Sequence, residues 1–353
     1  ESEANLALDQ INKSTFHITN IEKKRVKRNP LAPFTTSTLQ QDASNKLGFG
    51  ASRTMRIAQK LYEGINIGSE TTGLITYMRT DGVQLSSQAI EELRNEISNR
   101  HGKSYIPDNP RVYKSKAANA QEAHEAIRPT DIARDPESIS NYLDAEQLKL
   151  YDLIWKRTIS SQMQSAELDE TAADISSKDQ SMTFRANGSQ VIFPGFFVYR
   201  DKEDDRLLPN LNEKEEVDLS KVESDQHFTQ PPPRYTDASL IKKMEELGIG
   251  RPSTYASILQ VLINRNYVEK EKGKHIPQER GRILTAFLNN FFGKYIEYDF
   301  TAELEKKLDT VSDGKLNYKK LLKFKLKNLF KFKLKNIFKF KIKNYNLGAT
   351  NLL

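Results

Sequence analysis

Apolar residues recur at helical spacing in two stretches of the N-terminal half. The segment from Thr38 to Leu61 follows a period near 3.6 and is interrupted at Gly48-Phe49-Gly50, which favours a turn. The segment from Leu85 to Arg100 is amphipathic, with Ile90, Leu93 and Ile97 on its apolar face and Ser86 or Ser87 available as the N-cap. The pattern therefore predicts two helices joined by a turn, followed by a third.

Strand-like patterns lie on either side of these helices. Phe16, Ile18 and Ile21 indicate a short strand before a basic stretch, and residues 165–234 predict a β-rich module with strands near 171–175, 182–186, 190–199 and 216–222. After Pro231 the pattern becomes helical again. Leu240, Met244 and Leu247 share a helix face that ends at Gly248.

The segment after Gly248 predicts a second helix and a hairpin. Ser253 is a candidate N-cap for a helix that carries Tyr255, Ile258, Leu259 and Leu262, and Tyr267 begins a possible wing. Helix, turn, helix and hairpin form a common nucleic-acid-binding arrangement, although many such units are purely structural. Because helical and strand-like stretches alternate, the fold class is mixed α/β.

The end of the chain has a repeat of eight residues. The units KFKLKNLF, KFKLKNIF and KFKIKNYN, residues 323–346, alternate Lys with Phe, Leu or Ile. Low-complexity expansion or a reading-frame accident is the favoured interpretation, and an amphipathic strand on a membrane surface or on DNA is the alternative.

Composition narrows the class of protein. At 353 residues the chain is long enough for two or three domains, and no apolar run approaches the length of a membrane span. We expect a soluble, cytoplasmic protein with no membrane partner, and a truncated one because no initiator Met is present. With no Cys and five scattered His, neither a disulfide framework nor a local metal site is expected.

The net charge of +7 is a property of the tail. Twelve of the 54 basic residues are lysines from Lys315 onward, where there is no acid, which leaves 42 basic against 47 acidic residues in the rest of the chain. A nucleic-acid site in the body must therefore rest on local clusters, such as the one from Lys23 to Arg28 or the pair Arg53 and Arg56.

The strongest chemical signal is the segment Leu74 to Gly82, LITYMRTDG, in which an apolar, strand-like run meets a polar cluster. The Tyr77 phenol is a potential nucleophile, and Arg79, two positions on, projects from the same strand face. A free phenol is only about 0.1% ionised at neutral pH, so Tyr77 needs help from groups that stabilise charge. Arg79 can hold a phosphate, whereas Asp81 either orients Arg79 or is a turn residue beside Gly82. Taken alone, Tyr77 is more typical of a packing residue.

Five blocks of the sequence, in order, resemble one family. The Leu74–Gly82 segment closely resembles the active-site motif of bacterial DNA topoisomerase I, the type IA family. Four further blocks resemble the same family: residues 33–64, QEAHEAIRPT at 121–130, residues 231–262, and DFTAELEKKLDTVSDGK at 299–315. Together the matches span roughly nine-tenths of the chain.

The resemblance implies an incomplete, toroid-like core of several domains. Residues 1–35 and 165–235 correspond to a β-rich arch, 36–164 to an α/β tyrosine domain, 236–320 to a helical DNA-binding base, and 321–353 to the Lys/Phe tail. Nothing in the chain resembles the family's N-terminal TOPRIM domain, whose Glu, Lys and acidic triplet supply proton transfer and Mg²⁺, or its C-terminal zinc modules. Mg²⁺ is thus expected for the family, with its ligands outside this chain.

The resemblance also assigns roles to residues. Tyr77 and Arg79 correspond to the catalytic pair, and His124, Arg128, Arg251, Ser253 and Thr254 correspond to DNA-binding residues. Asp81 and Arg53, which are candidates from their own positions in the sequence, complete the set of DNA-binding or supporting residues. His124 and Arg128 lie four apart in AHEAIRP, so we expect them on one helical face.

The implied activity is relaxation of negatively supercoiled DNA through a 5′-phosphotyrosine, impaired in this chain alone unless a separate TOPRIM-containing polypeptide assists. No phosphate-binding loop appears, which fits a transesterification that uses no ATP. The alternative is a remnant or partner subunit that binds single-stranded DNA without cleaving it. A tyrosine recombinase is disfavoured, because that family places its nucleophile after its His and Arg elements, whereas Tyr77 precedes His124 and Arg128.

Overall fold

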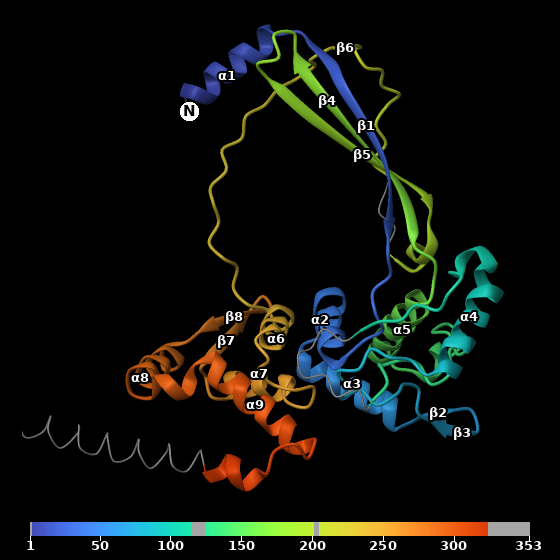
Figure 1. Cartoon of the computed structure of the whole chain (residues 1–353), viewed down its shortest axis with the longest axis vertical. Helices are drawn as coiled ribbons and strands as arrows, with labels where there is room; N and C mark the ends of the chain where they lie inside the picture. The colour runs from blue at the N-terminus through green and yellow to red at the C-terminus, as the bar shows by residue number, and fades with distance from the viewer. Residues whose placement is uncertain (1, 115–123, 201–204, 324–353) are drawn as a thin grey trace, which may run out of the picture.

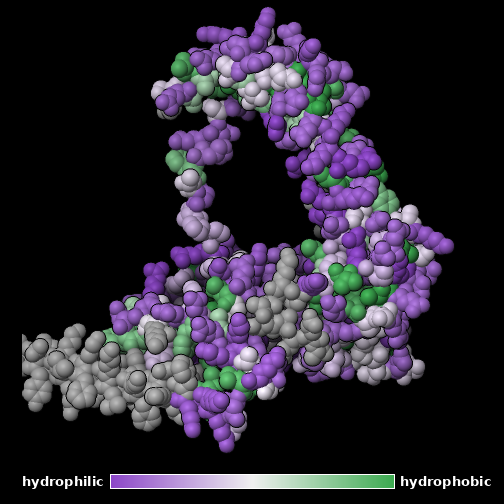
Figure 2. Space-filling view, in the orientation of Figure 1, coloured by the Kyte–Doolittle hydropathy of each residue, from purple (hydrophilic) through white to green (hydrophobic). Residues whose placement is uncertain are grey.

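The chain forms a ring around an open space (Figure 1). The computed structural model describes residues 2–114, 124–200 and 205–323, so the Lys/Phe repeat beyond residue 323 lies outside the described residues. Side chains do not fill the opening, and its rim is mainly hydrophilic (Figure 2). A sheet forms the top of the ring, and two groups of helices form its base.

The sheet joins segments that are far apart in the sequence. Strand β1 (Phe16–Arg28) pairs antiparallel with β4 (Ala166–Ser177), from Phe16 opposite Ser177 to Arg28 opposite Ala166. Strand β5 (Thr183–Phe193) extends the sheet beyond β4, and β6 (Glu216–Val217) pairs with the other edge of β1. The mixed α/β class and the strand-rich character of this region are therefore confirmed.

Several predicted boundaries in this region are wrong. The basic stretch lies within β1 instead of after it, and helix α1 (Ser2–Lys13) precedes the sheet. The strand expected to reach residue 199 ends at Phe193 and is followed by the 3₁₀ helix η3 (Gly195–Tyr199). The strand predicted for residues 216–222 is only two residues long, and it is the strand β6.

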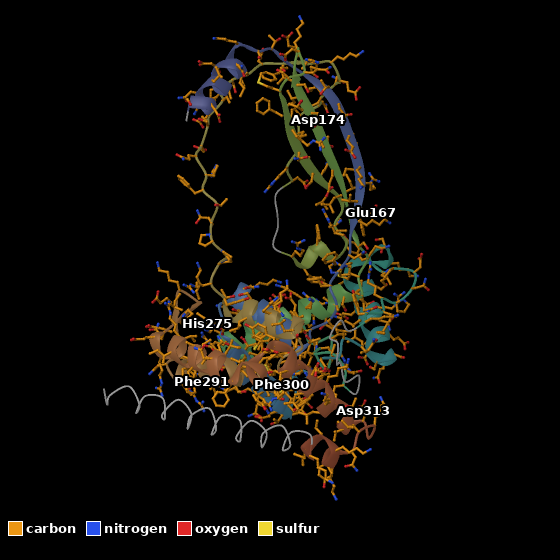
Figure 3. The ribbon with its side chains drawn as sticks, turned by 60° about the vertical axis from the view of Figure 1, so that its left-hand side comes forward. Glu167, Asp174, His275, Phe291, Phe300 and Asp313 are labelled. Carbon is orange, nitrogen blue, oxygen red and sulfur yellow. The ribbon has the colours of Figure 1, made fainter. Side chains whose placement is uncertain are left out.

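Three of the five cations in the basic cluster of β1 are paired with acids across the sheet. Arg25 lies 2.8 Å from Asp169, Lys27 lies 2.9 Å from Glu167, and Arg28 lies 2.7 Å from Glu170. Glu167 and Asp174 mark the course of β4 along the arch in Figure 3. Exposed pairs of this kind contribute little to stability. They neutralise Arg25, Lys27 and Arg28 but leave Lys23 and Lys24 without an ion pair among the described residues, so the attraction of the cluster for nucleic acid is reduced.

The helices on one side of the base contain the largest apolar core. They are α2 (Thr36–Leu47), α3 (Ala51–Glu63), α4 (Ser87–His101) and α5 (Ala145–Ser161), with the hairpin β2 (Ile65–Ile67) and β3 (Glu70–Thr72) and the short helices η1 (Lys103–Tyr105) and η2 (Ser140–Tyr142). Their shared core includes Leu39, Leu61, Leu93, Ile97 and Tyr151. Gly48 ends α2 in a left-handed conformation at φ 68°, and the Ser86 side chain caps α4, as predicted.

The other side of the base is the predicted helix, turn, helix and hairpin. It comprises α6 (Asp237–Glu246), α7 (Tyr255–Asn264), β7 (Val268–Glu271) and β8 (Lys274–Pro277), followed by α8 (Glu279–Ile296) and α9 (Tyr298–Ser312). The predicted cap at Ser253 is wrong, because α7 begins at Tyr255 and is preceded by a turn in which the Arg251 N–H donates to Thr254 Oγ1. Within the described residues, no helix is long and apolar enough to cross a membrane.

The two sides of the base meet at the start of α3. Ala51 packs against the buried residues Ile241, Met244, Tyr255 and Leu259. The N-cap of α3 is Gly50, which has no side chain to accept a hydrogen bond. Asp237, at the start of α6, supplies this acceptor: its Oδ2 lies 3.0 Å from the Ala51 nitrogen. A carboxylate at a helix N-terminus is favoured both by the hydrogen bond and by the helix dipole.

Three hydrogen-bond donors keep the buried Asp237 carboxylate charged. Its Oδ1 lies 2.8 Å from Lys270 Nζ and 2.9 Å from His275 Nε2, and His275 lies in the base in Figure 3. Burial raises the pKa of Asp237. The hydrogen bonds from His275, Lys270 and the Ala51 N–H outweigh it and hold that pKa well below its usual range.

We expect Asp237→Asn to lower the free energy of unfolding by about 1–3 kcal/mol at pH 7, because a buried charge-assisted network loses its anion. The folded-state pKa lies below the unfolded value of about 4, so this contribution is present above about pH 4 and is lost as the pH falls further. Urea unfolding between pH 7 and pH 3 should therefore show a smaller acid loss in the variant. Exposed Asp313, which pairs with Lys315, provides the control Asp313→Asn. An equal effect of the two substitutions contradicts the prediction.

Candidate active site and nucleic-acid interface

The segment that carries Tyr77 and Arg79 is not a strand. Its regular pairing is limited to one isolated bridge between Ile75 and Pro129, so the strand prediction is wrong. The alternation of burial is nevertheless present: Met78 and Thr80 are buried, whereas Tyr77 is 38% exposed and Arg79 is exposed. The phenol and the guanidinium thus both lie on the exposed side of the segment.

Thr36, the first residue of α2, holds the Tyr77 segment in place through hydrogen bonds. The Thr36 N–H donates to the Thr80 carbonyl at 2.8 Å, and the Thr80 N–H donates to Thr36 Oγ1 at 2.9 Å. The same hydroxyl donates to the Met78 carbonyl at 2.7 Å. These bonds replace the hydrogen bonds of a strand, and they hold the backbone on both sides of Arg79.

Tyr77 lies between two other rings. Its ring centroid is 5.4 Å from that of Tyr62 and 5.7 Å from that of His124, both edge to face. In the part of the chain that the structure describes, neither the Tyr77 hydroxyl nor the Arg79 guanidinium forms a hydrogen bond or an ion pair. Both groups are therefore available to a ligand. No pattern in the sequence marked Tyr62 as a neighbour of Tyr77.

His124 and Arg128 do not share a helix, so that prediction is also wrong. The chain here is irregular, and Ile127 forms an isolated β-bridge with Phe34. Arg128 precedes Pro129, and a helical conformation is disfavoured for the residue before a proline. The Arg128 N–H donates to Thr76 Oγ1, and its guanidinium binds Glu125 Oε2, each at about 3 Å. Only His124 contacts Tyr77, whereas Arg128 has a mostly buried, paired guanidinium.

Gly82 permits the approach of the His124 segment. A Cβ at this position would lie 2.1 Å from the His124 carbonyl oxygen and 3.1 Å from Thr80 Oγ1. The contact is with backbone, which cannot move aside as the end of a flexible side chain does. The close packing of these two segments thus requires glycine.

The remaining candidate residues lie apart from Tyr77. Arg53 binds the Glu146 carboxylate, with Nε 3.1 Å from Oε2, and its guanidinium lies over the Phe49 ring. In the base, Arg251 is bound by two acids of α9, Ser253 is exposed, and Thr254 belongs to the turn before α7.

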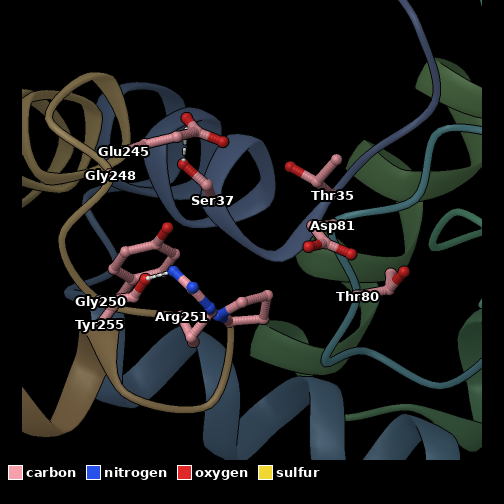
Figure 4. A pocket seen from close by; sticks show the side chains of 10 residues that line it. Thr35, Ser37, Thr80, Asp81, Glu245, Gly248, Gly250, Arg251 and Tyr255 are labelled. Atoms are coloured by element: carbon pink, nitrogen blue, oxygen red, sulfur yellow. Dashed lines mark hydrogen bonds between the residues drawn. The ribbon is translucent and has the colours of Figure 1, made fainter. Parts of the chain in front are cut away.

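A small pocket of about 30 Å³ brings Asp81 and Arg251 together (Figure 4). Thr35, Thr80 and Asp81 line one side, and the segment Gly250 to Pro252 with Tyr255 lines the other. Ser37 donates to Glu245 at 2.7 Å across the interface between the two sides. Sequence reasoning missed Ser37 and Glu245, because each has the ordinary character of a helix residue and their contact spans 208 positions.

The described residues do not fit a magnesium site. No group of three or more His, Cys, Asp or Glu side chains among them is placed to hold a metal ion. Mg²⁺ needs oxygen ligands at near-octahedral geometry, which such a site would have to provide.

Comparison with known proteins identifies the family. The family model for DNA topoisomerase matches residues 1–323. DNA topoisomerase 1 of Rickettsia felis is 53% identical over 329 residues, 91% of this chain and 42% of that protein. DNA topoisomerase 1 of Zymomonas mobilis is 49% identical over 91% of this chain and 26% of its own length.

A solved structure shows the same fold. Full-length topoisomerase I from Thermotoga maritima superposes with a TM-score of 0.85 at 38% identity, over 93% of this chain and 54% of that one. The chain therefore belongs to the bacterial type IA DNA topoisomerase family, and the predicted core fold is confirmed. It spans about two-fifths of the length of its rickettsial relatives.

We expect Gly82→Ala to lower the free energy of unfolding by about 1–3 kcal/mol, because the new methyl group overlaps the His124 backbone. It should also displace His124 from the Tyr77 ring, which NMR of the histidine side chains can detect. Gly293→Ala in α8 is the matched control, since a Cβ there meets no atom within 4 Å. The prediction fails if the two variants are equally stable.

Proposed function

We propose that this chain is the strand-cleaving core of a type IA topoisomerase, with Tyr77 as the nucleophile and Arg79 as the group that holds the scissile phosphate. One observation carries the proposal. Among the described residues, the exposed Tyr77 hydroxyl and Arg79 guanidinium form no hydrogen bond or ion pair, and both lie on a segment that Thr36 holds in place. His124 supports the Tyr77 ring. Asp81, Arg251, Ser253 and Thr254 form the interface for single-stranded DNA, with Arg53 and Arg128 in supporting positions.

The proposed reaction exchanges one phosphodiester for another. The Tyr77 oxygen forms a bond to phosphorus and loses its proton, while the bond from phosphorus to the 3′ oxygen breaks and that oxygen gains a proton. The 5′ phosphate remains on Tyr77, and the reverse reaction reseals the strand. The two esters are of similar energy, so no ATP is consumed. The Arg79 guanidinium stabilises the added negative charge of the transition state.

The way in which the ring is closed supports the proposed passage of a DNA strand. The arch is covalently continuous with both sides of the base, whereas the two sides meet at Ala51 and Asp237 through non-covalent contacts (Figure 1). Separation of this interface would admit a second strand and allow relaxation of negatively supercoiled DNA. We assign residues 1–35 and 165–235 to the arch, residues 36–164 to the tyrosine domain, residues 236–320 to the helical base and residues 321–353 to the tail. We also place the protein in the cytoplasm.

The second candidate function is binding of single-stranded DNA without cleavage. It is favoured by the lack of a metal-binding group among the described residues. We therefore propose that this stretch of chain is impaired when alone and that a TOPRIM-containing polypeptide with Mg²⁺ restores cleavage.

A covalent adduct is the direct test. The purified chain is incubated with a labelled single-stranded oligonucleotide, with and without Mg²⁺ and a TOPRIM-containing fragment, and is resolved on a denaturing gel. We expect an adduct with both additions, none in Tyr77→Phe, and about 10²- to 10³-fold less in Arg79→Ala, because one charge-stabilising donor is lost. Tyr142→Phe, at an exposed tyrosine elsewhere, should retain it.

An adduct that persists in Tyr77→Phe contradicts the assignment of the nucleophile. DNA binding without an adduct under every condition identifies the non-cleaving alternative.

A further inference from the structure

Arg251, which the proposed function assigns to DNA, is already bound by α9. Its Nη1 lies 2.8 Å from Glu305 Oε2, and its Nη2 lies 2.7 Å from Asp309 Oδ2. Nη1 also donates to the Gly250 carbonyl at 2.9 Å. The three charged side chains are only 21–26% exposed, so water screens these pairs less than it screens pairs on the open surface. Both terminal nitrogens of the guanidinium are therefore engaged by acceptors.

The charges around the pocket that Arg251 lines disfavour a phosphate in this conformation. Its other charged lining residues, Asp81 and Glu245, are acidic. The two carboxylates that bind Arg251, Glu305 and Asp309, outnumber its single charge, and they oppose the approach of an anion to it.

We propose that Glu305 and Asp309 occupy the positions on Arg251 that a DNA phosphate takes, so that α9 sets the affinity of this site for single-stranded DNA. The two acids are four residues apart and lie on one face of α9. A carboxylate presents to a guanidinium a pair of oxygens like that of a phosphate. The inference rests on the proposed role of Arg251, and it predicts exchange of partners, not addition of a phosphate to a free cation.

Replacement of a carboxylate by its amide should favour this exchange. Asn and Gln keep the shape and one acceptor oxygen, but they convert an ion pair into a weaker hydrogen bond and remove the repulsion of a phosphate. We expect Asp309→Asn to tighten binding by about three- to tenfold at low salt, and Glu305→Gln/Asp309→Asn to tighten it further. The slope of log Kd against log salt should change by less than the value of about 0.7 for one added phosphate contact, because the same phosphate binds Arg251 in both complexes.

Fluorescence anisotropy of a labelled deoxythymidine oligonucleotide, titrated with the full chain at several NaCl concentrations, measures both quantities. Glu305→Gln keeps an acceptor for the Gly250 N–H, which donates to Glu305 at 2.9 Å. Glu303→Gln is the matched control, because Glu303 lies on the same helix, is exposed and pairs with Lys307 instead. Thermal unfolding of every variant checks the fold, and Arg251→Gln is measured alone and combined with Asp309→Asn.

Tighter binding in Asp309→Asn, unchanged binding in Glu303→Gln, and loss of the gain when Arg251→Gln is added would support the inference. If Asp309→Asn binds equally or more weakly while Arg251→Gln also binds weakly, the acids only orient Arg251, and the inference is overturned without harm to the proposed function. A gain that survives Arg251→Gln reflects net charge alone and likewise overturns it. If neither variant changes binding, Arg251 is not a DNA contact, whereas the Tyr77 adduct still tests cleavage separately.

Discussion

The contact between Asp237 and the N-terminus of α3 is the constraint on which the ring depends. Gly50 leaves α3 without a side-chain cap of its own, and the carboxylate that replaces it comes from a helix that starts 186 residues later. The apolar cluster around Ala51 closes over the same point. This junction places Asp81 on one wall of the pocket and Arg251 on the other, so the pocket exists only while the interface is closed.

Charge pairing gives the second organising principle. Most of the cations that the sequence analysis assigned to DNA are held by carboxylates. Arg53 binds Glu146, Arg128 binds Glu125, Arg251 binds two acids of α9, and three basic residues of β1 bind acids on β4. Among the described residues, Lys23, Lys24, Arg56 and Arg79 form no ion pair, and Arg79 is the one beside the exposed tyrosine. A count of basic residues therefore overstates the attraction of this surface for DNA.

Local patterns in the sequence predicted the elements whose causes are local. The turn at Gly48, the cap at Ser86 and the wing after Tyr267 depend on neighbours within a few residues, and all three are present. The failures lie where distant segments decide the backbone. The Tyr77 segment resembles a strand, but its partners are Thr36 at a helix start and the irregular chain at Arg128. His124 and Arg128 have helical spacing, but two features exclude a helix there. Ile127 forms a β-bridge with Phe34, and Pro129 disfavours a helical conformation at Arg128.

The side of the base on which the partners of Asp237 lie affects how the ring could open. Lys270 and His275 both belong to the hairpin of the base, the same side as Asp237. Separation of the interface would therefore remove only the Ala51 N–H from the carboxylate and leave its contacts with Lys270 and His275 in place. The bond from Ser37 to Glu245 likewise joins an acid of the base to a neutral donor. Leaving a buried charge without its partner is far more costly than loss of a neutral donor. Because the ion pair of Asp237 with Lys270 lies within one side, the junction can be specific when closed and still separate without leaving this carboxylate unpaired.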